Sequence, residues 1–168
     1  MKTEFKSFNC SYNELKTLKN SPWKITEYFS CRNNRLQSLE GGPKIIFEEF
    51  DCAHNMLFSL EGGPIEVGDY YDCQSNTLES LKGAPKKINS DFDCSNNKLK
   101  TLEYCPEYIK GDFDCSFNPL ETLNFLPKKI DGEFVFVTNQ KVEWFNEEDI
   151  KKKCDVKKIT LIWEYDEW

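Results

Sequence analysis

Hydrophobic and polar positions repeat along the chain with one unbroken period of 21 residues. Each copy has an aromatic residue two positions before a cysteine, an asparagine three positions after it, and leucines five and eight positions after it. A proline follows at position twelve and a β-branched aliphatic residue at fifteen. A seventh copy has Phe136 where the cysteine would stand. The period is set by Cys10, Cys31, Cys52, Cys73, Cys94 and Cys115, and a constant spacing of this length is typical of a stacked-repeat architecture.

The residue types in each copy predict one short strand followed by a compact return. The aromatic residue and the cysteine lie two positions apart, so in an extended segment both point to the same side and their neighbours point away. The asparagine can bond the backbone of adjacent turns where the strand bends. No copy has room for a long helix. Stacked turns bury a continuous apolar core that a single repeat cannot enclose, which predicts a β-rich solenoid.

The repeat resembles a known family. The segments Phe50-Asp-Cys-Ala-His-Asn-Met-Leu57 and Phe92-Asp-Cys-Ser-Asn-Asn-Lys-Leu99 are similar to the core of leucine-rich repeats, in the short form found in bacteria and phages. The resemblance covers about residues 5–144. It implies a leucine-rich repeat solenoid of about seven 21-residue turns, with a parallel sheet on the concave face and a role in protein recognition. Two departures, the aromatic residue in place of leucine and the repeat length, leave the curvature open.

The two ends of the chain differ from its middle. We assign residues 1–139 to the solenoid and residues 140–168 to a small α/β cap that covers the last apolar layer. Within the cap, Asn146 is expected to begin a helix over residues 147–153, and residues 159–165 alternate as a strand. No cap precedes Phe8, so the N-terminal edge is a candidate for homodimer formation. The aromatic residues of 163–168 are a further candidate contact.

Charge is distributed unevenly along the repeats. The 168-residue chain, long enough for one domain, has a net charge of -7. The seven strand segments carry eleven acids and two bases, a net charge of -9, whereas the remaining residues carry 18 acids and 20 bases. An acidic strand face argues against direct nucleic-acid binding. The chain also lacks the run of ~20 apolar residues that spans a membrane and the apolar stretch of a secretory signal. These features predict a cytoplasmic protein, in the host cytoplasm if a phage encodes it.

Outward acids recur one and three positions before the cysteine. Neighbouring carboxylates in such rows repel each other by about 0.2–1 kcal/mol per pair, and a basic partner would explain why they are kept. The sequence therefore predicts an interaction protein that binds, and inhibits, a basic protein such as a nucleic-acid-binding enzyme, by imitating a nucleic-acid backbone, as phage anti-defence proteins do by analogy. The alternatives are a surface that only maintains solubility, and a protein that sequesters a small ligand or cation. The candidate partner-binding residues are Tyr28, Glu49, Asp51, Tyr70, Asp72, Asp91, Asp93, Asp112, Asp114 and Glu133.

Catalysis and cofactors are not indicated. The acids repeat in similar surroundings, whereas a catalytic pair needs two different environments, and no common catalytic motif is present. The cysteine column is expected to be buried packing rather than disulfides or a metal site. Cys105 and Cys154 lie outside this column and are better candidates for reactive thiols. The lone histidine, His54, is expected at the surface.

Overall fold

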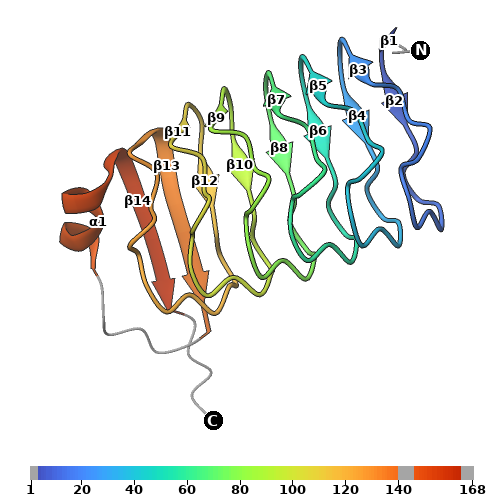
Figure 1. Ribbon diagram of the computed structural model, residues 1–168. Coiled ribbons are helices and arrows are strands. Elements are labelled where there is room, and N and C mark those ends of the chain that lie inside the picture. The colour runs from blue at the N-terminus through green and yellow to red at the C-terminus, as the bar shows by residue number, and fades with distance from the viewer. Residues whose placement is uncertain (1–3, 140–145, 164–168) are drawn as a thin grey trace.

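The computed structural model, which describes residues 4–139 and 146–163, is a parallel β-solenoid of about seven turns (Figure 1). The turns stand side by side in one row, from the N-terminal strands in blue to the C-terminal cap in red. One short helix, near the C-terminus, is the only α-helix in these ranges. The solenoid expected from the 21-residue period is therefore confirmed.

The first strand of each repeat unit stacks in what we call the aromatic ladder. Consecutive members pair parallel and in register, so that each aromatic residue lies opposite the aromatic residue of the next turn. Neighbouring rings from Phe8 to Phe134 have centroids 4.9–6.0 Å apart, and all of them except the partly buried Phe8 are buried in the core. The ladder consists of β2 (Phe8–Asn9), β4 (Phe29–Ser30), β6 (Phe50–Asp51), β8 (Tyr71–Asp72), β10 (Phe92–Asp93), β12 (Phe113–Asp114) and the second half of β13 (Lys129–Thr138).

A second strand in each turn corrects the expectation of one strand per repeat. The buried β-branched residue fifteen positions after the cysteine, such as Ile25 or Ile88, sits in a two-residue strand of its own. Two residues are too few to show alternation, so the sequence pattern did not reveal it. This aliphatic ladder consists of β1 (Glu4–Phe5), β3 (Lys24–Ile25), β5 (Ile45–Ile46), β7 (Glu66–Val67), β9 (Lys87–Ile88), β11 (Tyr108–Ile109) and the start of β13.

The aliphatic ladder is interrupted once in the described residues. Strands β1, β3, β5 and β7 form one sheet, while β9 and β11 join β13 and, through it, the aromatic ladder. No pairing is found between β7 and β9 within the part of the chain that the structure describes. The aromatic ladder continues across the same boundary, because β8 pairs with β10. The fourth and fifth turns are thus joined by strand pairing on one side only.

A row of buried asparagines holds the bend after each strand of the aromatic ladder. The side-chain nitrogen of Asn55 donates to the backbone oxygens of Cys31 and Cys52, and its oxygen accepts from the backbone N–H of Leu36. Asn34, Asn76, Asn97 and Asn118 make the same set of bonds. The predicted asparagine ladder is confirmed.

The residue just before each of the first six asparagines has a left-handed backbone. Its φ lies between 52° and 56°, a region that L-residues other than asparagine, aspartate and glycine enter at a cost of about 1–2 kcal/mol. The conformation points these side chains away from the core on the outer side of the bend. The column consists of Tyr12, Asn33, His54, Ser75, Asn96 and Phe117.

The C-terminal segment closes the stack. Helix α1 (Glu147–Lys153) begins after Asn146, whose side chain accepts from the backbone N–H groups of Glu148 and Asp149 in a capping box. This helix matches the predicted range. Strand β14 (Asp155–Trp163) pairs with β13 and starts four residues before the predicted strand. The end of the predicted strand and the aromatic contact proposed for residues 163–168 lie largely outside the described residues.

No helix within residues 4–139 and 146–163 is long and apolar enough to cross a membrane.

Candidate acidic binding site

The register of the aromatic ladder brings the predicted acids together in two rows. Parallel pairing places Asp51 next to Asp72, Asp72 next to Asp93 and Asp93 next to Asp114. We call this the inner row, and the positions two residues earlier the outer row. The inner row reads Asn9, Ser30, Asp51, Asp72, Asp93, Asp114 and Val135, and the outer row Ser7, Tyr28, Glu49, Tyr70, Asp91, Asp112 and Glu133.

The inner-row carboxylates hold the bend that follows each strand. One oxygen of Asp93 accepts from the backbone N–H of Ser95 at 2.9 Å, and Asp51, Asp72 and Asp114 accept from the residue two positions on at 2.8–3.0 Å. Asn9 makes the same bond to Ser11 at 2.9 Å. The bend therefore requires an acceptor oxygen at this position. It does not require a negative charge, because the neutral amide of Asn9 accepts the same bond in the first turn.

Asp72 departs from the expected solvent-facing row. Its relative exposure is only 3%, and its second carboxylate oxygen accepts from Gln74 at 3.1 Å and from Arg32 at 3.2 Å. Arg32 belongs to a turn two repeats earlier, and the small Ala53 lies at the equivalent position in the turn between them. Burial raises the pKa of Asp72 to about 6 even with this guanidinium beside it, and the neighbouring acids add to the rise.

The outer-row aspartates bond the backbone of the next turn. Asp91 accepts from the backbone N–H of Asp112 at 2.8 Å, and Asp112 accepts from Glu133 at 2.8 Å. Gly111 makes the first contact possible, because a Cβ there would lie 2.0 Å from the Oδ1 of Asp91. The carboxylates are therefore held in place while remaining exposed.

Acids of both rows converge on a hollow of about 450 Å³, which we call the acidic hollow. Six of the predicted residues line it, from four successive turns. The described residues that line it include six acids and no base, so the local charge is strongly negative. The lining consists of Glu49, Asp69, Tyr70, Ser90, Asp91, Phe92, Asp93, Asp112, Asp114 and Val135.

Burial and mutual repulsion shift the titration of the groups in this hollow. Burial raises the pKa of Asp93, and the charge of Asp114 raises it further, against the hydrogen bonds from Ser95. Burial also raises the pKa of Tyr70, with a further contribution from the inner-row acids. Tyr70 therefore stays a neutral phenol whose hydroxyl can donate, and a cation entering the hollow would favour the charged form of Asp93.

Four of the ten predicted residues lie outside the acidic hollow. Tyr28 is exposed on an earlier turn, while Asp51 accepts from Ser30 and, like Asp72, lies near Arg32. Glu133 pairs with Lys158 at 2.6 Å, so the cap neutralises the far end of the outer row. Asp69 and Ser90 belong to the hollow but were not predicted as site residues; both lie four positions before a cysteine, where alternation alone does not indicate an outward direction.

The cysteines form no disulfides in the described structure, and all except the half-buried Cys10 are buried. Burial raises the pKa of the thiols in the ladder, including those of Cys52 and Cys94. Cys105 and Cys154 are buried as well, and burial raises the pKa of both thiols, to about 11 for Cys154. Burial and a raised pKa both disfavour the reactive thiolate, so the structure gives no support to the prediction that these two cysteines are reactive.

Within the described ranges, no group of three or more histidine, cysteine, aspartate or glutamate side chains is placed to hold a metal ion. Comparison with known proteins found no match: no family model, no curated protein and no solved structure matches this chain.

Proposed function

We propose that this chain is a non-enzymatic interaction module, a solenoid of the leucine-rich repeat type, whose acidic hollow binds a basic protein surface. The observation that carries the proposal is the convergence of six carboxylates, without a base, on one hollow of about 450 Å³. Such a concentration of like charge costs stability in the free protein and is relieved when a cationic group enters.

The hollow has the chemistry to accept lysine or arginine side chains. The exposed acids Glu49, Asp91 and Asp112 can guide an approaching cation from solvent. The half-buried Asp93 can form a charge-assisted hydrogen bond inside the hollow, which is stronger than one between neutral groups. Tyr70 offers an aromatic surface for a guanidinium or ammonium group.

The rows also suggest what kind of basic surface fits. Carboxylates recur along the stack at about the strand spacing of ~4.8 Å, which gives a linear series of negative charges. A basic groove that binds a nucleic-acid backbone is complementary to such a series, so the protein would compete with nucleic acid and inhibit its partner.

A salt-dependent capture experiment tests the proposal. Immobilised protein is exposed to a cell lysate at low and at high salt, and the retained proteins are identified by mass spectrometry. We expect basic proteins to be retained at low salt and largely lost at high salt, because screening shortens the range of the electrostatic attraction. The binding of one retained protein is then measured with purified components.

A charge-neutralising variant locates the binding surface. We choose Asp91→Asn, Asp93→Asn, Asp112→Asn and Asp114→Asn together, because asparagine keeps the acceptor oxygen that each backbone bond needs, as Asn9 shows. The matched control removes the same charge elsewhere, with Glu40→Gln, Glu79→Gln, Glu103→Gln and Glu121→Gln. We expect at least a hundredfold loss of affinity in the first variant and little in the control. Equal affinity of both variants would refute the proposal.

A small cationic ligand is the second candidate, favoured by the size of the hollow and by Tyr70 in its wall. Calorimetry with spermidine and with arginine separates the two: a micromolar isotherm for either would favour sequestration of a small cation over recognition of a protein.

A further inference from the structure

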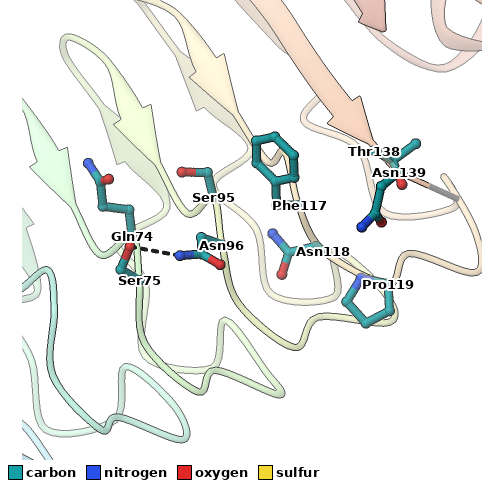
Figure 2. A pocket seen from close by; sticks show the side chains of 9 residues that line it. All are labelled: Gln74, Ser75, Ser95, Asn96, Phe117, Asn118, Pro119, Thr138 and Asn139. Carbon is teal, nitrogen blue, oxygen red and sulfur yellow. Dashed lines mark hydrogen bonds between the residues drawn. The ribbon is translucent and has the colours of Figure 1, made fainter. Parts of the chain in front are cut away.

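A second hollow lies at the opposite end of the same strands, past the cysteine column. Its volume is about 590 Å³, and its lining comes from four successive turns (Figure 2). The side chains supply amide, hydroxyl and apolar groups, and none of the described lining residues is charged. We call it the amide hollow; its principal residues are Gln74, Ser75, Ser95, Asn96, Phe117 and Asn139.

We propose that the amide hollow binds a neutral, β-1,4-linked oligosaccharide that runs parallel to the solenoid axis. The neutral lining is the first argument. An ionic ligand would lose hydration here without meeting an opposite charge, which is unfavourable. A sugar carries many hydroxyl groups that both donate and accept, and these match amides and serines in the wall.

The amides are held in fixed orientations before any ligand arrives. The side-chain nitrogen of Asn96 donates to the hydroxyl oxygen of Ser75 at 3.0 Å, which is the bond drawn in Figure 2. The side-chain nitrogen of Gln74 donates to Asp72 and to Asp93, each at 3.1 Å. The amides of Gln74 and Asn96 thus have a set direction for their carbonyl oxygens, and fixed acceptors reduce the entropy lost on binding.

Phe117 supplies an apolar platform in this polar hollow. Its side chain is 48% exposed and its backbone is left-handed, with φ 52°. The four preceding turns hold polar residues in the same column, two of them asparagines that suit this backbone. A phenylalanine is unfavourable here because of its left-handed backbone and because its apolar ring is exposed. Contact between this ring and the apolar face of a pyranose ring would give the residue a function that fits its position.

The spacing between turns favours a β-1,4 linkage between the sugar units. Strands stack at about 4.8 Å, which is close to the length of one unit in an extended β-1,4-linked chain. One sugar ring would therefore lie over each turn, and because successive rings are flipped, rings of the same orientation would recur at every second turn. An α-1,4-linked chain coils and loses this match.

Nuclear magnetic resonance of the isotope-labelled full chain tests the proposal with three probes: cellohexaose, chitohexaose and the α-linked maltohexaose. We expect at least one β-linked hexamer to shift the amide signals of residues 74–75, 95–96 and 117–118, with much smaller shifts from maltohexaose. Absence of shifts with both β-linked hexamers, or equal affinity for maltohexaose, would overturn it.

A pair of matched variants locates the platform. Phe117→Asn removes the ring and places at this backbone the residue found at Asn33 and Asn96, so the fold is retained. Tyr12→Asn makes the same kind of change in the same column, at a residue that is 77% exposed and outside the hollow. We expect Phe117→Asn to weaken binding about tenfold and Tyr12→Asn to leave it unchanged. Equal effects would overturn the proposal. Phe117 lies outside the acidic hollow, so this outcome is independent of the proposed basic partner.

Discussion

The asparagine ladder and the inner acidic row both recur once per turn and both bond backbone N–H groups, but they differ in how strictly they repeat. From the second to the sixth turn each asparagine is 3–9% exposed, donates to carbonyls of two turns and accepts from a leucine. The inner row changes along the stack, from Asn9 and Ser30 through four aspartates to Val135. The one feature common to Asn9 and the four aspartates is a hydrogen bond accepted from the backbone N–H two residues later.

This difference separates what the fold requires from what it permits. A buried bend needs the donors and the acceptor of one asparagine side chain in every turn, so the residue does not vary. The inner row needs at most an acceptor, which asparagine supplies in the first turn. The negative charge of the four middle turns is therefore additional to the requirements of the fold, which is why we attribute it to binding.

The largest expected effect comes from breaking the asparagine ladder. Asn76→Ala removes three bonds to backbone oxygens, including those of Cys52 and Cys73, and leaves the backbone N–H of Leu57 without its acceptor. We expect the free energy of unfolding to fall by about 3–5 kcal/mol, as measured by urea denaturation. The exposed Asn89→Ala is the control, with a change within ~0.5 kcal/mol. A loss below ~1 kcal/mol for Asn76→Ala would mean that the ladder is not essential.

The second largest expected effect is a dependence of the free energy of unfolding on pH, caused by the ionisation of Asp72. Its pKa is about 6 in the folded protein against 3.8 ordinarily, so between these values the folded state binds more protons and stability falls as the pH rises. The difference corresponds to at most about 3 kcal/mol. Asp72→Asn keeps the acceptor for the backbone N–H of Gln74 but loses the oxygen that accepts from the Gln74 side chain and from Arg32. We expect its stability relative to the parent to rise by about 1–3 kcal/mol between pH 3 and pH 7, because the parent alone loses stability as Asp72 ionises.

Denaturation series from pH 3 to pH 8 measure this dependence in both proteins. Parallel curves over the whole range would show that Asp72 ionises as readily in the folded chain as in the unfolded one.

Neutralising the half-buried aspartates of the inner row should have a smaller, salt-sensitive effect. Asp93→Asn with Asp114→Asn removes two adjacent pairs of like charges, Asp72–Asp93 and Asp93–Asp114. It keeps the backbone bonds to Ser95 and Ser116 and gives up the bond from Gln74 to Asp93. We expect a gain of about 0.5–1 kcal/mol at low salt, which disappears at high salt as screening weakens the repulsion. Thermal melts at both salt concentrations measure it, with Glu79→Gln and Glu103→Gln, two exposed acids, as the control. A gain that persists at high salt would rule out charge repulsion as its cause.

The smallest expected effect extends the acidic row into the first turn. Asn9→Asp keeps the acceptor for Ser11 and faces Ser30 rather than another acid. We expect a change within ~0.5 kcal/mol in the free energy of unfolding, from the same urea assay. A large loss would show that the fold disfavours charge in this row even without a neighbouring acid.

Much of the fold was predictable because the same pattern of residue types recurs in seven copies. The aromatic, cysteine, asparagine and leucine columns indicated a stacked core, and Asn146 followed by acids and lysines indicated the helix of the cap. The aliphatic ladder was missed, since Ile25 and its equivalents lie in strands too short to show a period. The interruption between β7 and β9 has no counterpart in the repeat pattern.

The candidate site was only partly predictable. Parallel stacking aligned the acids, and this followed from the constant period. The burial of Asp72 depends on Arg32, which reaches it across an intervening turn because Ala53 is small, and such a contact between residues 40 positions apart cannot be read from one repeat. The shape of the hollow depends on how five successive turns pack together, and this packing places Asp69 and Ser90 in its lining.

The interrupted aliphatic ladder has a mechanical consequence. Tension applied along the solenoid axis is carried by two columns of strand pairing at most turns, but by one between the turns of β7 and β9, where backbone bonds of the return path such as Lys98 N–H to the Leu78 oxygen add to it. We expect a chain pulled from its two ends to rupture there first, leaving two blocks that each keep both columns intact. Force spectroscopy would detect this as two unequal extension steps, the joint acting as a built-in weak link.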